Sequence, residues 1–132
     1  AVEHDPDWAK AVSEKTAEFA ETKVIAVPSV STGEIPSGKK GFEGQYFDSY
    51  VRAIRDHEGP FDLIVIDGRA REACLNEAIP KLARGGYILF DDSNRGRYRV
   101  AIEASGLKVE RLKGLAVCLP LPDATDLLSK PD

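Results

Sequence analysis

Three aspartates occupy positions in this 132-residue chain where acidic side chains could bind a ligand or take part in its chemistry. Asp67 directly follows one apolar run, Leu63–Ile66, and Asp91 and Asp92 directly follow a second, Tyr87–Phe90. If both runs are strands of one parallel sheet, their carboxyl ends meet at the edge where ligands bind. The spacing therefore predicts three carboxylates gathered at a ligand-binding edge.

The elements that must position these aspartates follow from the hydrophobic pattern. Phe61–Ile66 is almost continuously apolar, which is typical of a strand covered on both faces. A helix is predicted from about residue 70 to 83, with a kink or an early end at Pro80, because proline lacks the helical N–H. Gly85 and Gly86 then turn the chain into the second strand.

The segments on either side have their own signals. Asp5 and Pro6 form an N-cap and a first helical position, so a helix is expected from there to about residue 20, after a strand that ends at residues 1–2. A β-branched strand at 23–27 precedes a glycine- and proline-rich loop over Ser29–Gln45, and a helix is expected at 46–57. The remaining expected elements are a helix at 98–104, strands at 107–112 and 115–119 around a Lys113-Gly114 hairpin turn, and a tail.

This alternation of strands and helices predicts the α/β class. We expect a three-layer α/β/α sandwich with a Rossmann-like, mostly parallel sheet and a C-terminal antiparallel hairpin. The predicted domain covers residues 1–122, and residues 123–132 are expected to be an extended tail, because prolines occur after Leu119 at positions 120, 122 and 131.

Composition narrows the classes of partner. The net charge of −4 and the lack of a long basic run argue against a nucleic-acid or anionic-membrane surface. No apolar run is long enough for a membrane span, and no signal peptide is visible. Cys74 and Cys118 lack metal-binding or CxxC spacing, so we expect buried, reduced thiols in a cytoplasmic protein. Solvated positions at helix starts are expected for Arg69, Arg71, Arg95, Arg97 and Arg99.

Three segments carry a family resemblance: AVEHDPDW at residues 1–8, FDLIVIDG at 61–68 and LARGGYILFDDS at 82–93. Together they resemble the second, fourth and fifth strands of class I S-adenosylmethionine-dependent methyltransferases. The resemblance implies S-adenosylmethionine as cofactor and methyl transfer to an acceptor, foremost an oxygen of a small molecule. It also implies that Glu3 accepts hydrogen bonds from the ribose hydroxyls, with His4 and Asp67 in the same cofactor pocket.

A metal is implied by one branch of that family. In catechol-type O-methyltransferases an acid after the fourth strand and an acid–amide pair after the fifth bind magnesium. Asp67, Asp91 and Asp92 fall on those positions, with Asp92 in place of the amide, and oxygen ligands suit Mg²⁺. The alternative is that Asp91 and Asp92 cap a turn and the next helix. Asp67 is also the candidate catalytic residue, and the candidate substrate contacts are Asn94, Arg95 and Tyr98.

The chain departs from the family pattern in one respect. The first strand and its glycine-rich loop are absent, since no GxGxG occurs. In that fold the first strand lies between the second and the fourth, so its loss leaves unpaired backbone groups on both sides. We expect either a part of a longer polypeptide, which the start within an element favours, or a degenerate relative.

Three other functions share part of this pattern with methyl transfer. A phosphoacceptor receiver domain could use Glu3, Asp5 and Asp67, but the lysine and the Ser or Thr that it needs after later strands are missing. A nicotinamide dehydrogenase would lack its glycine loop and its Tyr and Lys pattern. A non-catalytic binding domain of the methyltransferase fold stays open. The expected partner is a small-molecule substrate, with no nucleic acid and no membrane, and a homodimer is a possible assembly.

Overall fold

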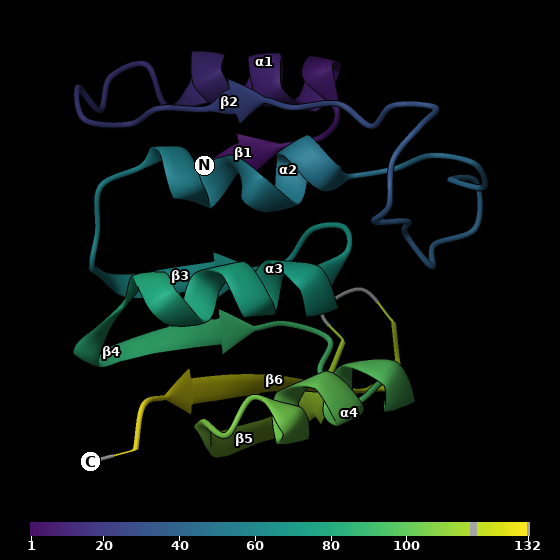
Figure 1. The fold of residues 1–132 in the computed structure, drawn as a ribbon. Coiled ribbons are helices and arrows are strands. Elements are labelled where there is room, and N and C mark those ends of the chain that lie inside the picture. The colour runs from purple at the N-terminus through teal and green to yellow at the C-terminus, as the bar shows by residue number, and fades with distance from the viewer. Residues whose placement is uncertain (117–118, 132) are drawn as a thin grey trace. The chain divides into compact units, whose positions relative to one another are not determined.

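A computed structural model describes residues 1–116 and 119–131, and the chain divides into two compact units. Unit 1 comprises residues 1–56 and 68–70. Unit 2 comprises residues 57–67 and the chain from Arg71 onward. Figure 1 shows the elements of both units in chain order.

Unit 1 combines a two-stranded parallel sheet with short helices. β1 (Val2–Glu3) pairs with β2 (Ile25–Ala26). α1 (Pro6–Lys15) begins where the sequence predicted, because the Asp5 carboxylate accepts hydrogen bonds from the backbone N–H groups of Asp7 and Trp8 at 3.0 and 3.1 Å. The helix ends at Lys15, about one turn earlier than predicted.

The long segment between β2 and the next helix is held by specific hydrogen bonds. Tyr46 exchanges two backbone hydrogen bonds with Val30, at 2.8 and 3.0 Å. The Asp48 carboxylate accepts from the backbone N–H groups of Ile35 and Glu34, and these bonds lower the pKa of Asp48. The predicted helix at 46–57 is in fact two short elements, α2 (Asp48–Arg52) and the 3₁₀ helix η1 (Ala53–Asp56).

Unit 2 is built on a four-stranded mixed sheet in the order β3-β4-β6-β5. β4 runs parallel to β3 and antiparallel to β6, and β6 is also antiparallel to β5. The strands are β3 (Phe61–Ile66), β4 (Leu82–Phe90), β5 (Lys108–Leu115) and β6 (Pro122–Ser129). The helices are α3 (Arg71–Ala78), its 3₁₀ continuation η2 (Ile79–Lys81) and α4 (Gly96–Ala104). The α/β class and the C-terminal antiparallel hairpin are therefore confirmed.

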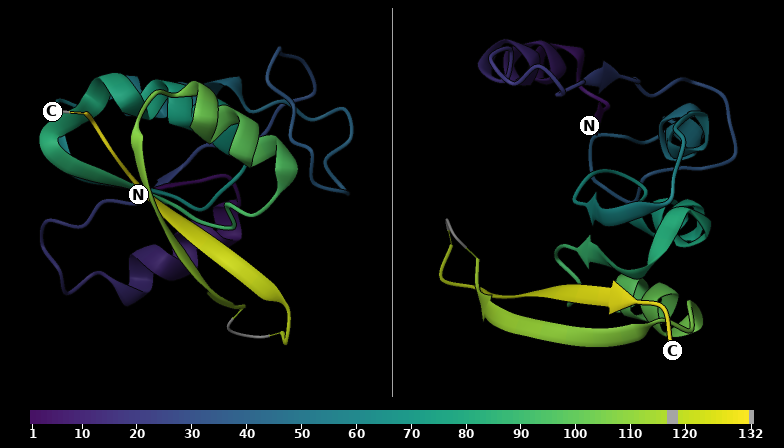
Figure 2. Two further views of the ribbon diagram at one scale, coloured as in Figure 1. Left: turned by 90° about the horizontal axis from the view of Figure 1, so that it is seen from below. Right: turned by 90° about the vertical axis from the view of Figure 1, so that its left-hand side faces the viewer.

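The core of unit 2 lies between this sheet and its helices, which are on one face of it (Figures 1 and 2). Leu75 of α3 and Ile102 of α4 are buried there against the sheet residues Ile66, Ile88, Phe90 and Leu128, all at most 5% exposed. Each such side chain contributes about 1.5–3 kcal/mol of burial free energy. Proline at position 80 ends the α-helix early, as predicted, since α3 stops at Ala78.

The opposite face of the sheet is open. Leu63 and Val65 of β3 are 58% and 59% exposed, and Tyr87 of β4 is 48% exposed. The prediction that β3 is covered on both faces was therefore wrong. Both crossover helices of unit 2 pack against the same side, so alternate residues of the apolar strand face away from them.

The C-terminal hairpin differs from its predicted position. β5 continues straight through the Lys113-Gly114 pair, where Gly114 is paired with Asp123. Its partner is β6, so the tail predicted at 123–132 is wrong over residues 123–129. Ala124, Asp126 and Leu128 are buried at every second position, which is the period of a half-buried strand. The predicted strand at 115–119 includes Val117 and Cys118, which lie outside the described residues.

The two sheets are separate in the described chain, since no ladder joins β1 to β3. These are the strands that the resemblance predicted to flank an absent first strand. Among the described residues, no helix is long and apolar enough to cross a membrane.

Cys74 is the cysteine that lies within the described part of the chain. Cys74 is a free thiol, and burial raises its pKa to about 12. It is therefore protonated and unreactive at neutral pH, as expected for a structural cysteine. Cys118 lies outside the described residues.

Candidate acidic site at the carboxyl ends of β3 and β4

The carboxyl ends of β3 and β4 lie together, as the sequence predicted. Asp67 follows β3 and Asp91 follows β4, and the backbone N–H of Asp91 donates to the carbonyl of Ile66 at 3.1 Å. This bond continues the parallel pairing one residue past the strands and fixes the two aspartates side by side.

A buried arginine bridges the two strand ends. Arg71 is 8% exposed, and its Nη2 donates to Asp67 Oδ1 at 2.9 Å. Its Nη1 donates to the carbonyl oxygen of Asp91 and lies 3.5 Å from Oδ2 of the same residue. The guanidinium carbon also lies 5.6 Å from the centre of the Tyr98 ring. One cation is thus shared between both aspartates.

The sequence prediction of a solvated Arg71 was wrong. α3 begins at this residue, four positions after Asp67, so the side chain in the first helical turn reaches back over the sheet edge. The i to i+4 spacing of an acid and an arginine was the available signal.

Asp92 has a different partner. It adopts a left-handed backbone with φ of 58° and forms an ion pair with Arg95, three residues later. Asn94, the next candidate, donates from Nδ2 to the carbonyl of Pro122 at 3.0 Å. Asp92 and Arg95 therefore neutralise each other just beyond the strand end.

Tyr98 is a buried residue of α4. It is 5% exposed, its ring packs against Phe90 at 5.4 Å between centroids, and its hydroxyl accepts a hydrogen bond from Arg97 at 3.0 Å. This burial favours a packing role over the predicted contact with substrate.

A cavity of about 380 Å³ lies beside Asp91. This volume is within the usual range of small-molecule sites, about 300–1,000 Å³. Thr125 donates from its hydroxyl to Asp91 Oδ1 at 3.0 Å, which fixes the carboxylate in the cavity wall. Sequence reasoning missed this cavity because it depends on the position of the hairpin. The other lining residues are Leu112, Lys113, Gly114, Leu115, Asp123 and Ala124.

Glu3 lies in unit 1, at the carboxyl end of β1. Its Oε1 accepts hydrogen bonds from the backbone N–H groups of His4 and Asp5, at 2.7 and 3.0 Å, and lies 2.6 Å from Nδ1 of His4. Within the described part of the chain, Oε2 makes no hydrogen bond. The carboxylate is therefore oriented and keeps one oxygen that could accept from a ribose hydroxyl.

His4 packs in an aromatic cluster rather than standing free. Its ring lies 5.4 Å from Phe42, 5.9 Å from Phe47 and 6.2 Å from Tyr50, between centroids. Its position next to Glu3 agrees with the predicted neighbourhood, while its contacts are those of a packing residue.

Comparison with known proteins identifies the fold of the chain, but it identifies neither a protein family model nor a curated relative. No protein-family model matches the sequence, and no curated protein matches it either. Solved structures match over 99% of this chain. A precorrin-6y methyltransferase from Geobacter metallireducens has a TM-score of 0.61 at 14% identity, and an rRNA methylase from Streptococcus thermophilus has 0.61 at 9%. The N-methyltransferase NodS from Bradyrhizobium japonicum, in complex with S-adenosyl-L-homocysteine, has 0.56 at 13%.

The chain has the class I methyltransferase fold. It spans 66%, 72% and 65% of the lengths of those three structures, respectively. The matched 99% of the chain is built around the acid-ended strands β3 and β4, and the given sequence contains no GxGxG. At these identities the likeness fixes the architecture and leaves the activity to be argued from the residues.

The magnesium site of the catechol-type methyltransferases is not supported here. Among residues 1–116 and 119–131, no group of three or more His, Cys, Asp or Glu side chains could hold a metal ion. Arg71 is ion-paired with both Asp67 and Asp91, and Arg95 is ion-paired with Asp92. The three predicted ligands therefore face guanidinium groups, and they do not fit a divalent cation.

Asp67 is the acid whose proton affinity the site alters. Partial burial raises the pKa of Asp67, and its hydrogen bond with Asp91 and the nearby charges of Asp91 and Asp92 raise it further, while Arg71 opposes them. Its side chain is still 63% exposed. In a methyltransferase fold, such a carboxylate at the strand edge could accept a proton from an acceptor group.

We expect the Asp67 carboxyl to titrate above the ordinary aspartate pKa of about 3.9. Because the folded pKa is raised, the folded state binds more protons than the unfolded state between the two values, so the free energy of unfolding should fall as the pH rises through that window. Carbon-13 NMR of the aspartate carboxyls measures the midpoint, and Asp67→Asn assigns it. A midpoint at or below the ordinary value would contradict this expectation.

Proposed function

We propose that this chain binds S-adenosylmethionine and supports methyl transfer to a small-molecule acceptor, foremost an oxygen. The observation that carries the proposal is the oriented Glu3 carboxylate at the end of β1, in a chain with the methyltransferase fold. The NodS structure, which contains S-adenosyl-L-homocysteine, supports the choice of cofactor. When bound, the cofactor supplies an electrophilic methyl group.

The residues of the chain have separate tasks in this proposal. The free Oε2 of Glu3 accepts hydrogen bonds from the ribose diol. Asp67, whose pKa is raised, would accept the proton that an acceptor hydroxyl loses when it is methylated. Asp91, held by Thr125 and Arg71, hydrogen-bonds the acceptor from the wall of the cavity.

The cavity beside Asp91 suggests the kind of acceptor. Leu112 and Leu115 give it an apolar side, and Lys113 and Asp123 give it polar groups at the rim. A volume of about 380 Å³ suits a small, partly apolar molecule. Positioning such a molecule in line with the methyl carbon supplies most of the rate in methyl transfer.

A second function has its own supporting observation. Asp67, Asp91 and Asp92 are ion-paired with Arg71 and Arg95. Acids that are already paired favour a non-catalytic binding domain with the methyltransferase fold. One measurement distinguishes the two functions. A methyltransferase forms S-adenosylhomocysteine from S-adenosylmethionine, and a non-catalytic binding domain does not.

Calorimetric titration of the chain with S-adenosylmethionine tests the cofactor. We expect Glu3→Gln to weaken binding about tenfold, because the amide keeps the acceptor used by the backbone but loses the charge and the second acceptor. Glu18→Gln, an exposed acid elsewhere in unit 1, should leave the affinity unchanged. No binding at millimolar cofactor, or equal losses in both variants, would refute the cofactor assignment.

A further inference from the structure

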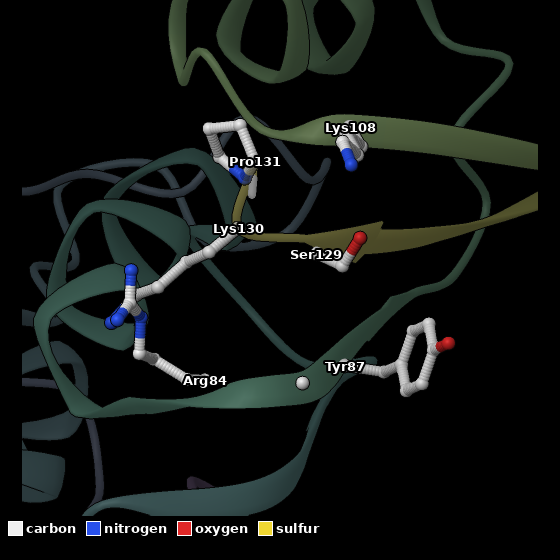
Figure 3. Close-up of a pocket in the computed structure, with 7 residues that line it drawn as sticks. Arg84, Tyr87, Lys108, Ser129, Lys130 and Pro131 are labelled. Carbon is white, nitrogen blue, oxygen red and sulfur yellow. The ribbon is translucent and has the colours of Figure 1, made fainter.

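A second cavity of unit 2 lies at the end of the sheet away from the acidic site. It has a volume of about 590 Å³ and opens where β4 begins and β6 ends (Figure 3). Its lining residues come from β4, β5, β6 and the segment after β6: Arg84, Gly85, Tyr87, Lys108, Ser129, Lys130 and Pro131.

The cavity exists because two neighbouring strands diverge. β4 and β6 are paired only between Ile88–Phe90 and Asp126–Leu128. Before Ile88, β4 is paired with β3 alone, with an irregular register between Leu82 and Tyr87, and Gly85 in this stretch has a left-handed φ of 78°. The space between the two diverging strands is therefore a fixed feature of the sheet.

The lining is strongly positive. Arg84, Lys108 and Lys130 contribute three cations, and none of the described lining residues is acidic. The whole chain has a net charge of −4, so this concentration of one sign runs against its composition. Lys130 donates from Nζ to the carbonyl of Leu82 at 2.6 Å, which holds the ammonium in place and leaves two N–H donors.

The Ser129 hydroxyl and the Tyr87 ring are neutral groups that also line the cavity. Lys108 is paired with Ser129 across the β5–β6 ladder, so their side chains share one face of the sheet. Figure 3 shows the Ser129 hydroxyl and the Tyr87 ring on the same side of the cavity. The Tyr87 side chain, in a residue 48% exposed, offers an aromatic surface beside the cations.

We propose that this cavity binds a nucleotide, with its phosphate on the cations and its base stacked on Tyr87. Arg84, the remaining N–H donors of Lys130 and the Ser129 hydroxyl offer hydrogen bonds to the oxygens of a phosphate, and two of these three groups carry positive charge. An exposed aromatic ring next to backbone-binding cations is the arrangement by which proteins hold unpaired nucleotides. The source is either a free mononucleotide or a nucleotide unit of single-stranded RNA.

The cavity is distinct from the acceptor site proposed beside Asp91, because it lies where β4 begins and Asp91 follows the end of that strand. The two cavities share no lining residue. Nucleotide binding is measured without S-adenosylmethionine, so a failure of the cofactor assignment leaves this proposal testable.

Titration of the full chain with ADP, inorganic phosphate and a fluorescent ten-nucleotide oligouridine tests the site. We expect Arg84→Ala to weaken ADP and RNA binding about tenfold, and Tyr87→Leu to weaken both by a similar factor without changing phosphate binding. Arg99→Ala, on the exposed side of α4, removes the same charge elsewhere and should have no effect. Arg84 and Tyr87 are exposed, and thermal unfolding by circular dichroism checks that the variants fold.

The outcomes separate the alternatives. Tighter binding of ADP than of the RNA per nucleotide identifies a mononucleotide site, and the reverse identifies an RNA contact. Phosphate binding alone, with no effect of Tyr87→Leu on any ligand, overturns the nucleotide assignment. An equal effect of Arg84→Ala and Arg99→Ala, or no binding of any ligand, overturns the site itself.

Discussion

Replacing Arg71 with methionine is expected to lower the free energy of unfolding by about 2–3 kcal/mol. The substitution removes the only guanidinium that contacts both Asp67 and Asp91 in the described structure, and leaves two carboxylates facing each other at the sheet edge. Complete burial would make the loss larger, about 3–5 kcal/mol, but both acids are partly exposed and water limits the cost.

Two measurements check this prediction. Urea unfolding gives the stability difference, and carbon-13 NMR should show the pKa of Asp67 rising further, because Arg71 is the group that lowers it. Arg99→Met provides a matched control at an exposed position, where we expect a change within about 0.5 kcal/mol. Asp67→Asn should restore part of the stability lost in Arg71→Met. A methionine variant as stable as the control would show that the bridge contributes nothing.

Replacing Arg111 with methionine should cost about 3–5 kcal/mol, the largest effect of any single change considered. Asp126 has no exposed surface, and Arg111 binds both of its oxygens, with Nε at 2.7 Å from Oδ1 and Nη2 at 2.5 Å from Oδ2. Without the guanidinium, a buried carboxylate would be left without its counter-charge between β5 and β6. The pair is matched across the ladder, so no other residue can take its place.

The unfolding free energy of Arg111→Met is measured in urea, where a buried carboxylate that has lost its partner should appear as a lower transition midpoint. Lys113→Met on the same strand is the control, and Arg111→Met with Asp126→Leu should recover much of the loss. Equal unfolding curves for Arg111→Met and Lys113→Met would refute the role of the pair.

The sequence correctly predicted the elements whose ends are set by residues within a few positions of one another. Asp5 and Pro6 located the start of α1, Pro80 located the end of α3, and the run after Phe61 located β3. The same signals placed Asp67 and Asp91 at adjacent strand ends. Each of these features depends on caps, backbone restrictions or hydrophobic runs within a few residues.

Features that depend on distant partners were not predicted. The role of Arg71 requires the end of β4 to lie within reach of the first turn of α3, which the sequence does not state. Gly114 looked like a turn residue, yet a glycine is tolerated within a long antiparallel ladder. β6 was predicted to be a tail because prolines occur at positions 120, 122 and 131. The pairing of β6 with β5 was not visible in the sequence, and the contact of Asp126 with Arg111 explains a buried acid there.

The exposed face and free edge of β3 have a consequence for the behaviour of the protein in concentrated solution. β3 ends the four-stranded sheet, so one row of its N–H and C=O groups has no ladder partner in the described chain. The segment FDLIVI has one charged residue and no proline, and Leu63 and Val65 are exposed on it. Such a segment favours cross-β stacking between molecules. Asp62 is the only residue in it that opposes aggregation, and Val65→Lys should slow fibril growth without disturbing the core.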